Sequence, residues 1–330
     1  MKRALQLSLL GGPRVSPNPF VGAVIVADGR IIGEGYHRVF GKEHAEVNAV
    51  NSVSEEDRVL LKQSTMFVTL EPCSHFGKTP PCADLVISIG IPHVVIAAED
   101  PFLKDYDSGI EKMRKAGVNV EVGLMRQEAL WINRRFFTAH TLKRPFVLLK
   151  WAQSADGFIA GKNGTQVQLS NPFTRMLMHR ERSLYDAILV GTDTLLNDNP
   201  QLNCRLWPAR LPEERPVKVT FGSARLKGES NLEQRRLLKK PEDESLNEFL
   251  HRLYEEQKII SLLVEGGSKT IESFLSSEMF DEIRVETSPV TLGEGIKAPN
   301  PMSFLKSGEW RETEPAIYDG NSVTYFVKNY

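Results

Sequence analysis

The residues with the clearest chemical potential are a histidine, a glutamate and two cysteines in the first half of the chain. His44 and Glu46 flank one alanine, and Pro72-Cys73 and then Cys82 follow them. Catalytic zinc commonly takes three nitrogen or sulfur ligands from the protein and leaves its fourth tetrahedral position to water. His44, Cys73 and Cys82 supply such a set, so we predict a zinc site at these residues.

Glu46 has the placement of a proton shuttle. Zinc lowers the pKa of its water toward neutrality, which makes hydroxide available for attack on an amidine-like ring carbon. The hydroxide must lose a proton and the departing amine must gain one, and a single carboxylate beside the metal can serve both needs. Two residues beyond His44, at an expected helix start, Glu46 can reach the water without being a ligand. We therefore predict a hydrolytic deaminase.

The spacing of the cysteines leaves an alternative open. Zinc-dependent base deaminases usually combine His-x-Glu with Pro-Cys-x-x-Cys, whereas here Cys73 and Cys82 enclose residues 74–81. A closed structural zinc centre would need a fourth ligand, which His37, His75 or His93 could provide. Such centres usually present two compact ligand pairs, and this chain instead joins one histidine to a carboxylate.

Composition excludes several classes of protein. The chain has 330 residues, 41% of them hydrophobic and 25% charged, which is typical of globular proteins and long enough for two domains. A formal net charge of −1 gives no global attraction to nucleic acid or anionic lipid. Three cysteines do not make a disulfide framework, and no apolar run is long enough to span a membrane. We expect a cytoplasmic protein whose first residues form a helix rather than a leader.

Strands and helices alternate in the first half, which predicts a layered α/β domain. Asp28-Gly29 separates two apolar runs and indicates a hairpin, because glycine supplies the positive φ that the turn needs. The expected elements are strands at 21–26, 31–36, 66–70 and 94–98 and helices at 45–52 and 108–116.

The pattern restarts after Lys143-Arg144-Pro145, because proline disfavours continuation of a helix. We place the domain boundary there, with residues 1–144 and 145–330 as the two domains. The charged stretch 228–256 is interpreted as a surface excursion that ends in a helix. Further expected elements are strands at 146–149, 187–190, 217–221 and 259–264 and helices at 174–184 and after Gly267.

These motifs resemble the bifunctional deaminase/reductase family of riboflavin biosynthesis, and the longer cysteine spacing is itself a mark of that family. The resemblance covers nearly the whole chain. It implies a cytidine-deaminase-like α/β/α layered domain followed by a dihydrofolate-reductase-like α/β domain. The stretches that carry it are 16–24, 33–37, 44–46 and 69–82 in the first half and 150–157, 186–191, 192–205 and 264–267 in the second.

The resemblance also implies the reactions and their cofactors. Zinc-dependent hydrolysis would convert 2,5-diamino-6-(5-phosphoribosylamino)pyrimidin-4-one to 5-amino-6-(5-phosphoribosylamino)uracil. NADPH would then reduce the ribosyl group, as its open-chain carbonyl, to ribityl. The partner would be this phosphoribosylated pyrimidine, with no nucleic acid and no membrane, and a homo-oligomer is compatible with it. By the same resemblance the deaminase substrate would meet Asn18, His37, His75 and Lys78.

In the second half the resemblance assigns residues to the cofactor and to the substrate. Among the residues assigned to the substrate, Arg182 and Arg205 could hold its phosphate bidentately. One stretch departs from the family, because Gln166 to Ser170 stand where an aromatic residue is usual. The cofactor would meet Gln153, Thr194, Asp198, Ser223, Gly267, Ser268, Lys269 and Thr270, and the substrate Arg182, Leu202, Arg205 and Glu265.

Two other functions fit parts of the sequence. One is a nucleoside or RNA base deaminase with a non-catalytic C-terminal module, which the near-zero net charge disfavours for RNA because phosphate contacts dominate nucleic-acid affinity. The other is a structural zinc protein with an NADPH-responsive binding module. Glu46 argues against the latter, since a structural site has no use for a proton shuttle.

Overall fold

The chain folds into two compact units, Met1–Leu142 and Lys143–Tyr330. The computed structural model describes residues 1–76, 80–101, 108–208, 216–221, 237–306 and 308–329. The units divide beside the predicted domain boundary at 144/145. Within the described residues, no helix combines the length and the apolar character that crossing a membrane requires.

The first unit is built on a five-stranded sheet of order β2-β1-β3-β4-β5. β1 pairs antiparallel with β2 and β3, whereas β3–β4 and β4–β5 are parallel. Asp28 and Gly29 turn the β1–β2 hairpin with φ of 51° and 73°, which confirms the predicted turn. The strands are β1 (Gly22–Ala27), β2 (Arg30–Tyr36), β3 (Thr65–Leu70), β4 (His93–Ala98) and β5 (Asn119–Val122).

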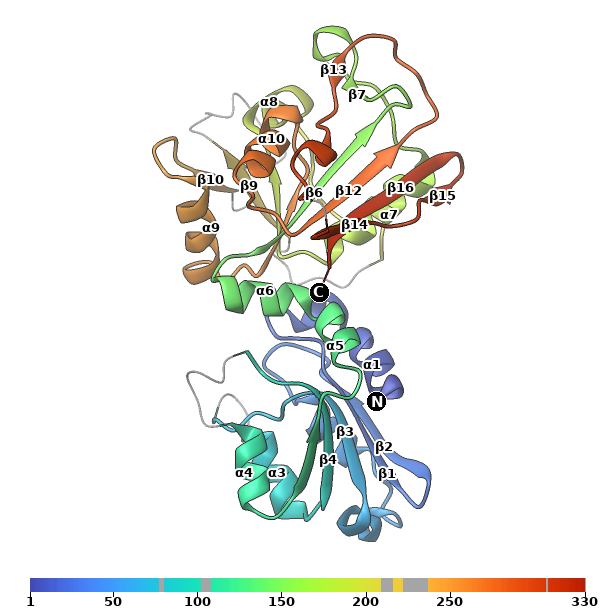
Figure 1. Ribbon diagram of the computed structural model, residues 1–330, viewed down its shortest axis with the longest axis vertical. Coiled ribbons are helices and arrows are strands. Elements are labelled where there is room, and N and C mark those ends of the chain that lie inside the picture. Colours follow the sequence, from blue (N-terminus) through green and yellow to red (C-terminus); the bar gives the residue numbers. More distant parts are fainter. Residues whose placement is uncertain (77–79, 102–107, 209–215, 222–236, 307, 330) are drawn as a thin grey trace. The chain divides into compact units, whose positions relative to one another are not determined.

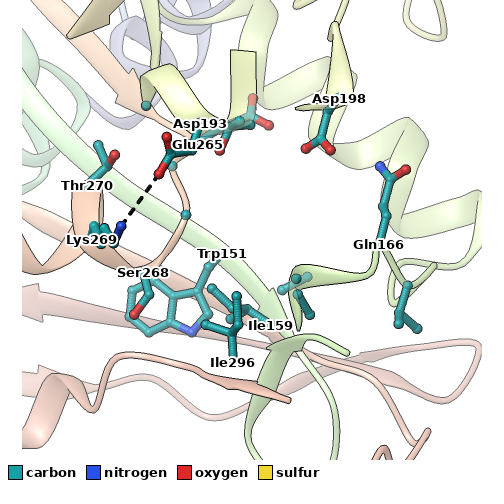
Figure 2. A pocket seen from close by; sticks show the side chains of 18 of the residues that line it. Trp151, Ile159, Gln166, Asp193, Asp198, Glu265, Ser268, Lys269, Thr270 and Ile296 are labelled. Atoms are coloured by element: carbon teal, nitrogen blue, oxygen red, sulfur yellow. Dashed lines mark ion pairs between the residues drawn. The ribbon is translucent and has the colours of Figure 1, made fainter. Parts of the chain in front are cut away.

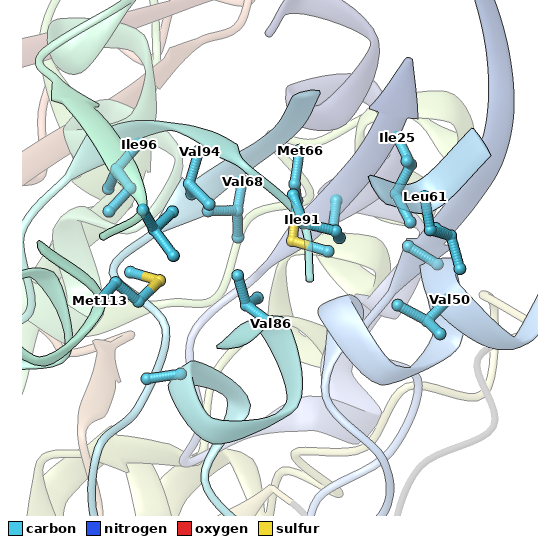
Figure 3. Packing of buried hydrophobic residues seen from close by; sticks show 14 of the residues in the cluster. Ile25, Val50, Leu61, Met66, Val68, Val86, Ile91, Val94, Ile96 and Met113 are labelled. Carbon is cyan, nitrogen blue, oxygen red and sulfur yellow. The ribbon is translucent and has the colours of Figure 1, made fainter. Parts of the chain in front are cut away.

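Helices cover both faces of this sheet (Figure 1). On one face Val50 of α2, Val86 of α3 and Met113 of α4 pack with the sheet residues Met66 and Val68 (Figure 3). On the other face α1 and α5 pack against Leu70 and neighbouring residues. The helices are α1 (Lys2–Ser8), α2 (Ala45–Asn51), α3 (Cys82–Ile89), α4 (Gly109–Lys115), α5 (Arg126–Ile132) and α6 (Arg134–Leu142), with 3-10 turns at Leu9–Val15 and Arg58–Gln63.

The second unit has a nine-stranded sheet of order β10-β9-β8-β11-β6-β12-β16-β14, and β15 also pairs with β16. The strands from β10 to β12 in this order are parallel, and β16 is antiparallel to its neighbours. The strands are β6 (Phe146–Gln153), β8 (Ala187–Val190), β9 (Val217–Phe221), β10 (Leu237–Lys240), β11 (Ser261–Val264), β12 (Glu282–Thr287), β14 (Trp310–Glu312), β15 (Ala316–Tyr318) and β16 (Asn321–Lys328), and β7 (Phe158–Ala160) pairs separately with β13 (Ile296–Lys297).

Both faces of this second sheet are also covered. Phe249 of α9 and Phe274 of α10 belong to one buried cluster, and Met178 of α7 belongs to the cluster on the other face. The α/β class with two layered domains, predicted from the sequence, is therefore confirmed. The helices are α7 (Pro172–Ser183), α8 (Thr192–Asp198), α9 (Leu246–Glu255) and α10 (Ser268–Ser276), with 3-10 turns at Lys162–Gly164 and Pro301–Ser303.

The interpretation of 228–256 as a surface excursion is wrong for its described part, whereas the helix expected at its end is confirmed by α9. β10 adds a strand to the sheet edge, and α9 begins with a capping box in which Ser245 and Glu248 bond each other's backbone amides. Phe249, Leu250 and Leu253 are fully buried. Apolar residues at helical spacing thus anchor this charged stretch in the core, and residues 228–236 lie outside the described residues.

A buried ion pair ties the start of β6 to β12. Arg144, 8% exposed, donates to both oxygens of Asp281 at 2.7 and 2.9 Å, and the Val147 amide donates to Asp281 at 2.8 Å. Because removal of one partner would leave a charge buried without compensation, this pair couples the first residues of the second unit to its sheet.

An Arg144→Ala variant should therefore unfold more easily. Breaking a buried ion pair typically costs about 3–5 kcal/mol, and urea unfolding would measure that loss. Arg58→Ala is the matched control, because Arg58 pairs with Glu55 while its side chain is 47% exposed. Equal unfolding midpoints for the two variants would contradict this account.

Candidate functional site

His44, Cys73 and Cys82 come together in the first unit. The nitrogen or sulfur atom that each offers lies within 4.8 Å of the others, and His44 Nδ1 is 3.6 Å from Cys73 Sγ and 3.4 Å from Cys82 Sγ. No fourth histidine, cysteine or acidic residue joins this group within the part of the chain that the structure describes. One nitrogen and two sulfurs at this spacing fit zinc and leave one tetrahedral position open.

The three side chains are held by two helix starts and one strand end. His44 is the N-cap of α2, Cys82 is the first residue of α3, and Cys73 follows β3. α2 lies directly on β2 because the strand carries glycine beneath it. A Cβ at Gly35 would lie 2.2 Å from the Ala49 nitrogen and 2.4 Å from the Ala45 oxygen, so any larger residue would push α2 away.

Glu71 fixes the approach to Cys73. Its buried carboxylate accepts from the Ser108 hydroxyl at 2.8 Å and from the amides of Ile110 and Asp100 at 3.1 and 3.3 Å. The start of α4 can approach Pro72 closely because Gly109 has no Cβ. A Cβ there would lie 2.0 Å from the Pro72 oxygen. The Pro72-Cys73 turn is thus clamped between β3 and α4.

Glu46 lies beside the cluster, in the first turn of α2, and is 3% exposed. Burial raises the pKa of Glu46 to about 7, with His44 opposing the shift. The pKa of the Cys73 thiol is lowered, first by a hydrogen bond from the Cys82 side chain and then by His44. The Cys82 amide also donates to Cys73 Sγ at 3.3 Å, which favours a thiolate ligand at that position.

The predicted substrate residues of this unit are only partly brought together. Asn18 Nδ2 lies 3.1 Å from Nε2 of the buried His37, whose Nδ1 lies 3.0 Å from the Glu43 oxygen. The His37 ring meets the His44 ring edge-on, 5.4 Å between centroids. His75 is exposed beyond Cys73, and Lys78 lies outside the described residues.

A second candidate site is a cavity of about 670 Å³ in the second unit. It lies where β6, β8 and β11 end, which is where open parallel sheets bind ligands. One side is apolar, with Trp151, Ile159 and Ile296, and the opposite side carries polar groups (Figure 2). There Lys269 Nζ lies 3.7 Å from a carboxylate oxygen of Asp193.

Many of the predicted reductase residues line this cavity. Thr270 packs closely against two turns, since a Cβ at Gly191 or Gly266 would lie 2.3 or 2.6 Å from its side chain. Burial raises the pKa of Asp198. Gln153 is not among the lining residues and accepts from Trp151 Nε1 at 2.9 Å, and Ser223 lies outside the described residues. The lining includes Thr194, Asp198, Glu265, Gly267, Ser268, Lys269 and Thr270.

The other predicted substrate residues lie outside the described lining. Arg182 donates to both oxygens of Glu265 at 2.6 and 2.8 Å and to the Asn203 oxygen at 3.2 Å. Burial by itself raises the pKa of Glu265, but Arg182, together with Lys150 and Arg284, lowers that pKa to about 2. Leu202 is buried in the core with φ of 45°, and the exposed Arg205 donates to Gln201 at 2.9 Å. In this structure Arg182 therefore forms an ion pair with Glu265 instead of facing the cavity.

Residues that the sequence reasoning missed also line the cavity. Lys150 and Trp151 come from β6. They begin the stretch 150–157 that carried the resemblance, but no role in the site was predicted for them. Burial lowers the pKa of Lys150, with Glu265 opposing the shift. The stretch from Gln166 to Ser170, noted as a departure from the family, forms part of the wall.

The two units that hold these sites each match a known protein family. Residues 1–98 match the family model of the cytidine and deoxycytidylate deaminase zinc-binding region, and residues 145–315 match that of the RibD C-terminal domain. A riboflavin biosynthesis protein RibD of Aquifex aeolicus is 38% identical over 90% of this chain and 88% of its own length. The chain belongs to the RibD family.

Other RibD proteins agree with this assignment over almost the full chain. RibD of Escherichia coli is 33% identical over 90% of this chain and 89% of its own length. The crystal structure of a diaminohydroxyphosphoribosylaminopyrimidine deaminase/5-amino-6-(5-phosphoribosylamino)uracil reductase from Thermotoga maritima has a TM-score of 0.87 and 37% identity, covering 100% of this chain and 97% of that one. Acinetobacter baumannii RibD has a TM-score of 0.85 and 27% identity, covering 100% and 98%. Two enzyme domains, deaminase-type and reductase-type, are therefore present.

A Gly35→Ala variant should bind zinc more weakly, because the added Cβ moves α2 and with it His44. We expect the variant to lose metal to a weak chelator that leaves the wild type loaded, as measured by zinc content after dialysis. Gly161→Ala is the control, since its Cβ would meet atoms only at 3.4–3.6 Å. Equal zinc retention in both variants would show that α2 tolerates the displacement.

Proposed function

We propose that this chain catalyses two successive steps of riboflavin synthesis on one phosphorylated pyrimidine. Residues 1–144 remove the 2-amino group of 2,5-diamino-6-(5-phosphoribosylamino)pyrimidin-4-one as ammonia, and residues 145–330 reduce the ribosyl group of the product to ribityl with NADPH. The observation that carries the first step is the convergence of His44, Cys73 and Cys82 beside the buried Glu46. The cavity at the ends of β6, β8 and β11 supports the second.

For deamination, His44, Cys73 and Cys82 would hold zinc, which when bound lowers the pKa of a water molecule and so supplies a nucleophile at neutral pH. Glu46 takes a proton from the attacking water and delivers one to the departing amino group. Its burial excludes bulk water from this exchange. Asn18 can offer its amide oxygen to the polar edge of the ring. The buried His37, whose two ring nitrogens bond Asn18 and the Glu43 carbonyl, holds the Asn18 amide in place.

For reduction, the cavity offers features suited to a dinucleotide. α10 begins at the cavity after Gly267, so its first amides can hold a phosphate, and Lys269 adds a positive charge. The apolar side with Trp151 suits a flat ring. NADPH bound there would supply the hydride. Glu265, kept ionised by Arg182, can accept hydrogen bonds from substrate hydroxyls, and Asp198 lies on the same cavity wall.

The alternative of a base deaminase with a non-catalytic second module is less well supported. Residues 145–315 match the RibD C-terminal domain, and the cavity there gathers charged and polar groups that a purely structural module would not need. The decisive experiment supplies the diaminopyrimidine ribotide with NADPH and follows ammonia release and NADPH oxidation separately. Oxidation that depends on prior ammonia release supports the proposed order, and ammonia release without any NADPH oxidation would support the alternative.

Glu46→Gln should keep zinc but lose deamination by about 10²- to 10⁴-fold, the usual contribution of a general acid–base group. Ammonia release and zinc content measure the two properties. Glu128→Gln, an exposed carboxylate on α5, is the control and should resemble the wild type. Near-normal ammonia release by Glu46→Gln would contradict the shuttle role.

Asp198→Asn should slow reduction while leaving ammonia release unchanged. Loss of a charged hydrogen bond in the cavity corresponds to a fall of about 10- to 100-fold in NADPH oxidation with the deaminated substrate. Asp243→Asn, exposed in the same unit, controls for loss of charge alone. Equal damage to both activities would argue against two separate sites.

A further inference from the structure

The short segment between the 3-10 turn Leu9–Val15 and β1 carries Asn18 but belongs to no helix or strand. Backbone amides and carbonyls in such a segment need partners from elsewhere when they are shielded from water. A side chain provides them at Phe20, whose amide and carbonyl both bond Asn133. Directly after the segment, at the start of β1, the Gly22 amide donates to Thr69 at 3.1 Å. The Asn18 backbone amide itself donates to the nearby Val15 carbonyl at 2.8 Å. The chain is thus held locally before Asn18 and by the distant Asn133 after it.

Asn133 bonds both backbone groups of Phe20. Its Oδ1 accepts from the Phe20 amide at 2.8 Å, and its Nδ2 donates to the Phe20 carbonyl at 2.9 Å. The reciprocal pair fixes the orientation of the side-chain amide, because the opposite orientation would face donor to donor and acceptor to acceptor. Asn133 thus acts on Phe20 as one residue of a neighbouring strand would.

Asn133 is itself held rigidly. It is 3% exposed, and it lies where α5 ends and α6 begins. Its amide donates to the Ala129 carbonyl at 3.1 Å, and its carbonyl accepts from the Phe137 amide at 3.0 Å. Ala129 packs in the cluster that joins α1 and α5 to the ends of β3 and β4. The amide is therefore a fixed point relative to the sheet.

From Phe20 the contacts lead to the candidate zinc site. Asn18 Nδ2 can only donate, so Nε2 of His37 accepts at 3.1 Å and Nδ1 of His37 donates to the Glu43 carbonyl at 3.0 Å. The His37 amide in turn donates to the Val21 carbonyl at 2.9 Å, beside Phe20. A shift of Phe20 would move both ends of the contact between Asn18 and His37, whose ring borders His44.

We propose that Asn133 is a positioning residue for deamination, which places Asn18 and His37 by fixing the backbone of Phe20. This inference rests on the proposed deaminase function. Asn133 contributes no group to the zinc cluster and lines no part of the cavity in the second unit. Its loss should therefore impair substrate binding by the deaminase and spare both zinc and the reductase.

The test measures three properties of the full-length Asn133→Ala variant: zinc content, NADPH oxidation with the deaminated substrate, and KM and kcat for ammonia release. Misplacement of a positioning contact by about 1 Å can cost about 10²-fold, so we expect kcat/KM for ammonia release to fall about 10- to 100-fold, mainly through KM. Zinc content and NADPH oxidation should equal those of the wild type. Asn119→Ala, exposed on β5, is the matched control and should change none of the three.

Asn133→Asp separates positioning from general stability. A carboxylate can accept from the Phe20 amide but cannot donate to its carbonyl, whereas the protonated acid can do both. Burial raises the pKa of such a carboxyl. The kcat/KM of Asn133→Asp relative to the wild type should therefore rise as the pH falls from about 8 to about 6.

Three results would overturn the inference. One is an unchanged KM in Asn133→Ala; another is a ratio for Asn133→Asp that does not depend on pH; the third is parallel loss of zinc and both activities in both variants. A wild type that releases no ammonia would instead refute the proposed function itself.

Discussion

Parallel pairing of strands decides where chemistry can occur in both units. In the first, Glu71, Pro72 and Cys73 follow the end of β3 at Leu70, and the parallel β4 beside it leads to Asp100, whose amide bonds Glu71. In the second, β6, β8 and β11 end side by side and the helices α8 and α10 begin there. Because helix starts present unpaired amides and strand ends free the side chains that follow them, polar groups from distant parts of the chain meet at one edge.

Shielding a carboxylate from water costs free energy, and in each unit hydrogen-bond partners next to the site offset that cost. Glu265, whose side chain is 11% exposed, remains ionised because Arg182 bonds both of its oxygens. Glu71 is buried and bonded by a hydroxyl and two amides, which fix it without a counter-charge. Glu265 and Glu71 hold the side chains and turns around them in one geometry. A functional site depends on such fixed geometry more than on additional stability.

Sequence reasoning found the parts of the structure that local chemistry dictates. The hairpin at Asp28-Gly29 follows from turn preferences, and the grouping of His44, Cys73 and Cys82 follows from the ligands that zinc prefers. The two-domain α/β class follows from alternating periods. What it missed depends on contacts distant in sequence. The strand β12 was missed because Arg284 and Glu286 are charged residues that the fold buries. The helix α9 was expected, but the charges around its apolar side concealed that it packs in the core.

Glu71 joins the metal ligands to the folding of the whole first unit, since the carboxylate that fixes the Pro72-Cys73 turn also fixes the start of α4. Anything that binds the native state alone stabilises it by mass action. A newly made chain that finds no zinc will therefore open more often near α4 and be exposed to proteases there. Cellular amounts of the enzyme should follow the supply of the metal as well as the rate of synthesis.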